Sequence, residues 1–179
     1  VPLMGDEVFI YNGPEDVNNM RRPRSTEADC YNYIISECKA AADLMTTSPN
    51  VHSARANRWT AKMLEARAAI YAASVATYNN RMTSPIHTVG GEVGIPASKA
   101  ADYYQTALAA AKDVIENSPY KLQDDPSMRK GENFYNAVCI KDNNTEVIWA
   151  RDYKKPTSTV RFSNLNIPSQ FKDDVDNSY

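Results

Sequence analysis

One long, alanine-rich stretch at residues 53–78 constrains the fold of this 179-residue chain more than any other feature. It predicts a helix of roughly 25 residues, with apolar side chains recurring at helical spacing on two faces. Polar residues occupy only one narrow stripe of this predicted helix, which we call its polar row. The first apolar stripe is Trp59, Met63, Ala66, Ile70 and Ala73, the second is Ala54, Ala61, Ala68, Ala72 and Val75, and the polar row is Arg55, Arg58, Lys62 and Glu65. A helix with two apolar faces has to lie between neighbours, as in helical bundles and solenoids.

The flanking segments supply those neighbours. Residues 26–46 carry apolar side chains at steps of three and four, and Thr26 with Asp29 forms an approximate capping box at their start. Residues 98–117 show the same spacing. We therefore predict a mainly α fold with long loops and little β, in which the three helices pack as antiparallel neighbours. The side chains expected in their core are Trp59, Met63, Ile70, Tyr104, Leu108 and Val114.

Two turn-rich segments precede and interrupt this helical core. Residues 1–24 are rich in proline, glycine and asparagine, and residues 79–98 contain three glycines and two prolines. Long loops inside a domain are more often functional or disordered than neutral. Because residues 79–98 have few apolar anchors, we expect weak order there until a partner binds.

The character of the chain changes after the third helix. Residues 118–145 are expected to form loops with a short helical turn at 134–138, and residues 146–150 predict a β-like run. The chain is interpreted as a single domain, with a helical core at about 25–117 and a loop-rich region at about 118–179.

The charge and the motifs of the sequence argue against nucleic-acid binding and against catalysis. The net charge is -2 and the isoelectric point is about 5.7, so nucleic acid is not an expected partner. The sequence contains no nucleophile motif, phosphate loop or metal-ligand spacing, so we expect neither an enzyme nor a cofactor or metal. The aspartates at 124–125 and 173–176 are interpreted as solvated charge.

Three cysteines, Cys30, Cys38 and Cys139, cannot all pair. Cys30 and Cys38 would be separated by roughly 12 Å along one helix, whereas a disulfide needs Cα atoms within about 7 Å. No cysteine and histidine cluster is present, so all three cysteines are interpreted as inert core residues.

Other residues with functional potential also have structural interpretations. Trp59 and Trp149 could stack on sugar rings, but each lies in an apolar run, and we favour packing in the core. Arg67 could bind a ligand, but pairing with a carboxylate across a helix interface is the interpretation we favour.

Five segments, in their order and spacing, resemble the SusD/RagB family. They are "RPRSTEADCYNYIISECKAAADLM", "ANRWTAKMLEARAAIYAAS", "ADYYQTALAAAKDVIENSPYKL", "NFYNAV" and "NTEVIWARDY". The likeness covers residues 1 to about 155. It implies a tetratricopeptide-like helical scaffold on the surface of the Bacteroidetes outer membrane, held by a lipid anchor upstream of residue 1. Members of this family are longer than this chain, and the sequence starts without Met, so we expect a fragment of a longer protein.

The same resemblance implies carbohydrate binding. Family members bind oligosaccharides and deliver them to a SusC-like TonB-dependent transporter for nutrient uptake. Residue type and position, and not the family, suggest Tyr153, Arg161, Phe162 and Asn164 as ligand-binding residues, because they combine a stacking surface with guanidinium and amide donors. The alternative is a helical-repeat scaffold that binds proteins or peptides in a concave groove, although a 34-residue repeat is missing.

Overall fold

The computed structural model describes residues 1–45, 54–79, 81–140, 144–151 and 153. These residues are mainly helical and include no strand, which confirms the predicted fold class. The helices are α1 (Val17–Met20), α2 (Glu27–Leu44), α3 (Arg58–Asn79), α4 (Ala100–Asn117) and α5 (Lys130–Cys139), with 3-10 turns at Pro14–Asp16 and Ala97–Lys99.

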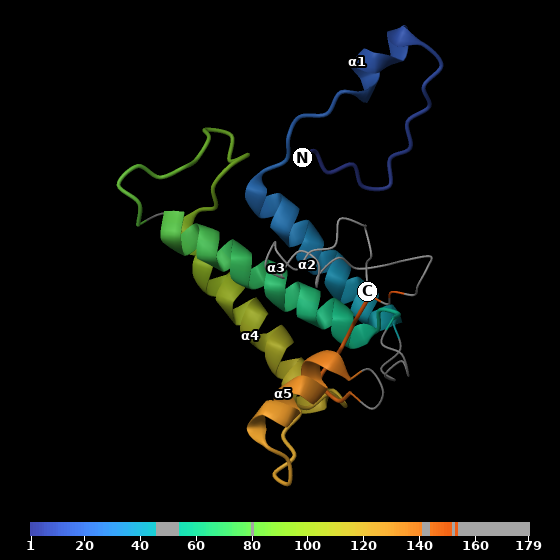
Figure 1. The fold of residues 1–179 in the computed structure, drawn as a ribbon. Helices are drawn as coiled ribbons and strands as arrows, with labels where there is room; N and C mark the ends of the chain where they lie inside the picture. Colours follow the sequence, from blue (N-terminus) through green and yellow to red (C-terminus); the bar gives the residue numbers. More distant parts are fainter. Residues whose placement is uncertain (46–53, 80, 141–143, 152, 154–179) are drawn as a thin grey trace, which may run out of the picture.

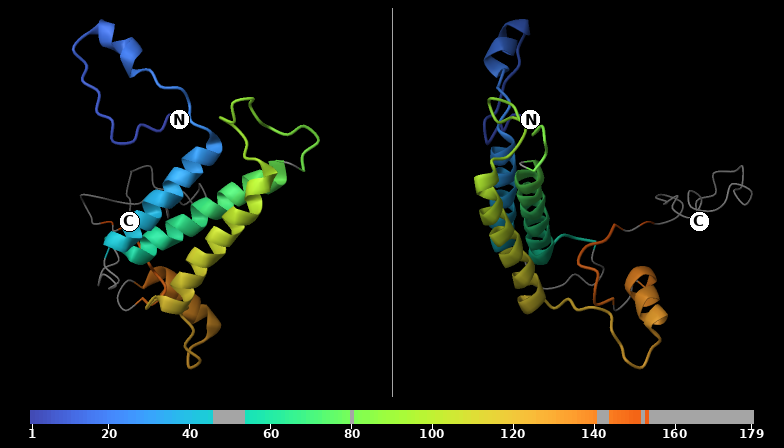
Figure 2. Two further views of the ribbon diagram at one scale, coloured as in Figure 1. Left: turned by 180° about the vertical axis from the view of Figure 1, so that it is seen from behind. Right: turned by 90° about the vertical axis from the view of Figure 1, so that its left-hand side faces the viewer.

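Helices α2, α3 and α4 form the body of the molecule and run in alternating directions (Figure 1). Helix α3 is central and packs against both of the others. Helix α5 is offset from these three, near the C-terminal end of α4 (Figure 2). The predicted antiparallel arrangement of the three long helices is therefore confirmed.

Alanine fills most of the contact between the long helices. The main buried cluster is Ala28, Ile35, Ala68, Ala69, Ala72, Ala73, Ala76, Ile95, Tyr103 and Ala107. The distance between packed helices depends on the side chains at their contact, so single methyl groups let the backbones approach closely. The alanines of both predicted stripes of α3 thus meet its neighbours, including Ala66 and Ala73 of the first and Ala68 and Ala72 of the second.

Most of the larger apolar side chains that the sequence places in the core are exposed. Trp59 and Val114 are buried, as predicted, whereas Met63, Ile70, Tyr104 and Leu108 are exposed, Ile70 to 50% and Leu108 to 60%. A helix can bury only the faces that point toward its neighbours. Because the alanines of α3 take up the close contacts, Met63 and Ile70 remain largely in solvent, although they share a stripe with the buried Trp59.

The polar row of α3 is not uniformly exposed either. Glu65 is only 3% exposed and lies between Lys39 of α2 and Lys62, with closest nitrogen-to-oxygen distances of 3.8 and 3.1 Å. A carboxylate taken out of water needs paired charges to offset its lost hydration. The two lysines supply them at the contact between α2 and α3.

Side-chain caps define where α2 and α3 begin. Thr26 Oγ1 accepts a hydrogen bond from the backbone N–H of Asp29 at 3.0 Å, which confirms the predicted cap of α2. Helix α3 begins at Arg58 rather than near residue 53, because Asn57 Oδ1 accepts from the N–H groups of Trp59 and Thr60 at 3.0 and 3.1 Å. An asparagine in this position satisfies donors that the first turn of a helix leaves unpaired.

Residues 146–150 do not form the predicted β-like run. Asn144 Oδ1 accepts hydrogen bonds from the N–H groups of Glu146 and Val147, at 2.9 and 3.0 Å, and this closes a turn. Local side-chain bonds of this kind compete with extended pairing. The predicted turn at 134–138 is present and extends into α5, and the short α1 lies in a segment predicted to be irregular.

The three thiols are free, and their environments differ. Cys38 is buried, Cys30 is half-buried and Cys139 is exposed, so the core interpretation is wrong for Cys139. Among the helices that the structure describes, none combines the length and hydropathy needed to cross a bilayer.

Candidate functional site

The chain after Ile148 presents aromatic and cationic groups to solvent at positions 149, 151 and 153. Trp149 is 61% exposed, so the core interpretation of this residue is wrong. Tyr153 is also exposed, and the guanidinium carbon of Arg151 lies 5.1 Å from the centre of its ring. A cation over an aromatic face stabilises both side chains in one arrangement. Tyr153 and Arg151 therefore form an aromatic and cationic pair at the surface.

Asn144 links the turn at residues 144–147, which precedes Trp149, to the end of α5. Its amide nitrogen donates to the carbonyl oxygens of Asn136, Ala137 and Ile140 at 3.1, 2.9 and 2.8 Å. The last carbonyls of a helix have no partner within the helix, so an amide donor there satisfies them. The same side chain therefore closes the turn at 144–147 and caps α5.

A second set of hydrogen bonds connects the turn at residues 144–147 to the chain that follows α4. The N–H of Lys121 donates to the carbonyl oxygen of Thr145 at 2.9 Å, and the N–H of Gln123 donates to Glu146 Oε2 at 3.1 Å. Two points of attachment fix the backbone close to Trp149. Binding residues are commonly carried on loops that a hydrogen-bonded scaffold holds in place.

Helix α5 adds further exposed aromatic rings. Phe134 and Tyr135 are both exposed, and Asn133 anchors the same helix by exchanging hydrogen bonds with the backbone of Asp125 at 2.9 and 3.0 Å. Two adjacent aromatic residues on a short helix outside the main alanine core are the sequence feature that could have indicated these exposed rings. We refer to these exposed residues of α5 and of the chain after it, Phe134, Tyr135, Trp149, Arg151 and Tyr153, together as the aromatic surface.

Only part of the predicted ligand-binding set can be located. Tyr153 is exposed, as a ligand-stacking residue has to be. Arg161, Phe162 and Asn164 lie outside the described residues. Sequence reasoning missed Arg151, which lies beside Tyr153, and assigned Trp149 to the core because it follows Val147 and Ile148 in an apolar run.

Two other residues considered from the sequence have structural roles. Arg67 is exposed, and its guanidinium carbon lies 6.0 Å from the centre of the Tyr71 ring, in place of the carboxylate partner that the sequence predicts. Asp125 accepts hydrogen bonds from the hydroxyl and the N–H of Ser127 at 2.6 and 2.9 Å, and these bonds lower the pKa of its carboxyl group. Its carboxylate therefore closes a local turn.

The first half of the 81–97 loop is attached to the end of α3. The side chain of Asn79 donates to the carbonyl oxygen of Ile86 and accepts from its N–H, at 2.5 and 2.7 Å. Ile95, near the other end of the loop, is buried in the alanine core.

The second half of this loop contacts the start of α2. The N–H of Gly94 donates to Glu27 Oε2 at 2.6 Å, and the N–H of Glu27 donates to the carbonyl oxygen of Gly91 at 2.9 Å. Ile95 is thus the apolar anchor of the loop, whereas Ile86 and Val89 are exposed, and the remaining attachments are polar hydrogen bonds. The order of the loop in solution and its contact with a partner stay predictions.

Within the described part of the chain, no group of three or more histidine, cysteine, aspartate or glutamate side chains is arranged to hold a metal ion. Comparison of the chain with models of protein families, with curated proteins and with solved structures finds no match in any of the three. Fold and site together define an α-helical protein whose loop-rich C-terminal part carries an aromatic surface.

Proposed function

We propose that this protein captures oligosaccharides by binding alone, in the manner of the SusD/RagB family that its sequence resembles. The single observation that carries the proposal is the exposure of Trp149, close in sequence to the exposed pair of Arg151 and Tyr153. In this proposal the protein belongs to the outer-membrane surface, is held there by a lipid anchor outside this chain, and passes glycan to a SusC-like TonB-dependent transporter.

The physical support comes from the chemistry of sugars. A pyranose ring has an apolar face of C–H groups that packs on an aromatic ring, and a rim of hydroxyls that need hydrogen-bond partners. Trp149 and Tyr153 supply rings, and the Arg151 guanidinium supplies several donors. Because hydrogen bonds through Asn144 and Thr145 hold this segment, less ordering is needed when a glycan binds.

Glycan-array screening of the chain, followed by calorimetric titration of the glycan bound best, tests this proposal. We expect Trp149→Ala and Tyr153→Ala to weaken binding severalfold without lowering the melting temperature, because both side chains are exposed. Tyr33→Ala is the matched control, since it removes an exposed tyrosine from α2. Absence of binding to any glycan, or equal affinity in all three variants, would contradict the proposal.

The proposal also includes the absence of turnover. Incubation of the purified protein with the bound oligosaccharide should leave its reducing-end concentration constant. Hydrolysis that disappears when one carboxylate is replaced by its amide would show an enzyme instead.

A helical-repeat scaffold that binds peptides is the second candidate. It is favoured by an open cleft between α2 and α4, the two helices that flank α3. A peptide pull-down in parallel with the glycan array separates the two functions, because only the scaffold function predicts retained peptides and an empty array.

A further inference from the structure

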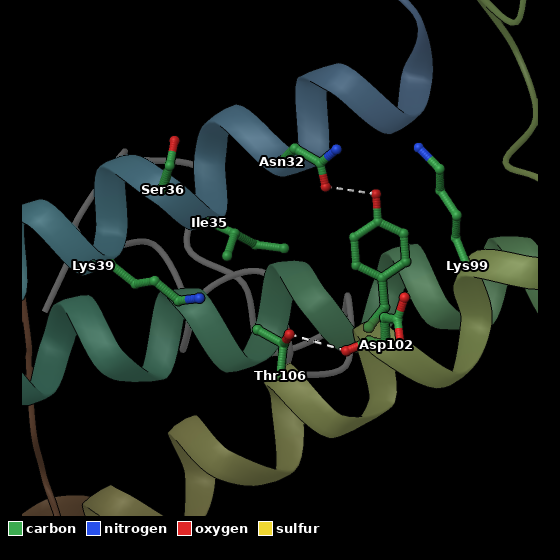
Figure 3. Close-up of a pocket in the computed structure, with 8 residues that line it drawn as sticks. Asn32, Ile35, Ser36, Lys39, Lys99, Asp102 and Thr106 are labelled. Atoms are coloured by element: carbon green, nitrogen blue, oxygen red, sulfur yellow. Dashed lines mark hydrogen bonds between the residues drawn. The ribbon is translucent and has the colours of Figure 1, made fainter.

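A cleft of about 390 Å³ separates α2 from α4 (Figure 3). One wall consists of Asn32, Ile35, Ser36 and Lys39 on α2, and the other of Lys99, Asp102, Tyr103 and Thr106 at the start of α4. Both walls follow the spacing of one helix face, at i, i+3, i+4 and i+7. Ile35 is the one aliphatic residue of the lining, and most of the others carry a polar group on a partly apolar side chain.

A hydrogen bond joins the two walls. The Tyr103 hydroxyl donates to Asn32 Oδ1 at 2.8 Å, and its oxygen is also 3.3 Å from the carbonyl oxygen of Ala28 (Figure 3). This contact fixes the spacing of α2 and α4 and occupies the amide oxygen of Asn32. Since no described residue accepts from the amide nitrogen of Asn32, that group is left to donate to a ligand.

The charges of the cleft are incompletely neutralised. Lys39 Nζ lies 3.8 Å from Glu65 Oε1, but the Glu65 carboxylate has a closer partner in Lys62, whose Nζ lies 3.1 Å from Oε2. Lys99, on the opposite wall, makes no ion pair with any described residue, and Lys39 and Lys99 lie toward different ends of the cleft (Figure 3). Asp102 supplies the one carboxylate of the lining. An anionic ligand would therefore find ammonium groups on both walls.

From this arrangement we infer that the cleft binds a short oligosaccharide bearing carboxylates, such as a uronic acid oligomer. This inference rests on the proposed function and places acidic glycan at a site separate from the aromatic surface. Sugar hydroxyls match the amide, hydroxyl and Asp102 groups, and sugar carboxylates match Lys39 and Lys99. A volume near the lower end of the range for ligand sites suits a short oligomer. An acidic peptide is favoured less, because Ile35 is the one aliphatic residue of the lining that could hold an apolar peptide side chain.

Calorimetric titration of the full chain with trigalacturonate, with maltotriose as the neutral probe, tests the inference. We expect trigalacturonate to bind more tightly at low salt than at high salt, because exposed charges are screened by ions. Lys99→Gln should weaken its binding about tenfold, because a charge-assisted hydrogen bond is lost. Lys39→Gln combined with Lys99→Gln should weaken it further. Lys112→Gln is the matched control, since Lys112 is exposed on α4 outside the cleft.

Lys99→Gln keeps the experiment interpretable even if Lys39→Gln disturbs Glu65 and lowers the melting temperature. Unchanged trigalacturonate affinity in Lys99→Gln, no trigalacturonate binding at all, or binding of an acidic peptide such as triglutamate in its place would each overturn the inference. Maltotriose binding that depends on Trp149, together with trigalacturonate binding that is absent or unchanged in Lys99→Gln, would leave the proposed function standing without this site. Lys99-dependent trigalacturonate binding that is unchanged in Trp149→Ala is the result expected of a site separate from the aromatic surface, and the aromatic surface would be contradicted if no glycan bound in a Trp149-dependent way.

Discussion

Alanine has the largest structural role of any residue type in this chain, because it forms the close contacts of α3. Ala69, Ala72, Ala73 and Ala76 have no exposed surface. Interiors are packed densely enough that an added methylene displaces neighbouring atoms. Small size, more than hydrophobicity, is therefore the property that these positions require.

Replacing Ala72 by leucine should lower the free energy of unfolding by about 1–3 kcal/mol, as overpacking of a filled core does. The exposed Ala109 of α4 gives the matched control, and Ala109→Leu should change stability by less than about 0.5 kcal/mol. Urea unfolding measures both. Ile70→Ala should cost less than the roughly 2–5 kcal/mol typical of a buried isoleucine, because its side chain is half exposed. Equal losses in Ala72→Leu and Ala109→Leu would show that α3 packs through another face.

The cysteines provide a test by chemical labelling. Burial raises the pKa of the Cys38 thiol, with a smaller contribution from the nearby Glu65 carboxylate, so at neutral pH it should remain a protonated and inaccessible thiol. Exposed Cys139 should react first with iodoacetamide, and Cys139→Ser should remove the fast phase. Mass spectrometry of the labelled peptides identifies the order. Fast labelling of Cys38 in the folded protein would be inconsistent with the packing of α2 on α3.

At the scale of elements, polar side chains fix where helices start and how loops attach to them. Asn57 is completely buried, caps α3 with its amide oxygen, and donates from its amide nitrogen to the Tyr120 hydroxyl at 2.8 Å. One side chain thus sets the start of α3 and holds the segment that follows α4.

Asn57→Ala should therefore lower stability by about 1–2 kcal/mol for the lost cap, and by more if the buried Tyr120 contact is not replaced by water. Tyr120→Phe removes only the bond between the two segments and should cost about 1 kcal/mol. Thermal unfolding of both variants separates the contributions. If Tyr120→Phe proved as damaging as Asn57→Ala, the cap would have no measurable role.

The 81–97 loop depends on Gly94, which has a φ of +91°. A Cβ atom there would lie 2.7 Å from the carbonyl oxygen of Ile86, closer than such atoms approach. We expect Gly94→Ala to lower the melting temperature and to loosen the contact with Glu27, because both strain and steric overlap oppose it. Gly131→Ala is the control, since it lies in α5 with open space around it and should be neutral or stabilising. Amide hydrogen exchange at Gly94 reports the contact directly, and unchanged protection in Gly94→Ala would argue against it.

On the scale of the whole molecule, the notable property is how much apolar surface remains in solvent. Large exposed side chains occur on α3, α4 and α5, including Ile70, Tyr71, Leu108 and Phe134. Exposed apolar surface in this amount is typical of proteins that contact other molecules. We expect the folded chain to bind a hydrophobic dye such as ANS, and Leu108→Lys and Ile70→Lys to reduce that binding without unfolding the protein. Dye fluorescence no higher than for a compact control protein would count against this expectation.

The sequence alone determined the helical class, the approximate position of each long helix, the cap at Thr26 and the burial of Trp59 and Val114. These features depend on local spacing and local hydrogen bonds, which the order of residues specifies directly. Tertiary structure decided which members of the two apolar stripes of α3 are buried, and alanine is favoured over Met63 and Ile70 because it allows the closer contact. It also decided that Glu65 is buried between two lysines, that Trp149 is exposed and that Asn32 and Tyr103 join the walls of the cleft. Each of these outcomes depends on residues far apart in the sequence, whose relative positions arise only when the helices pack.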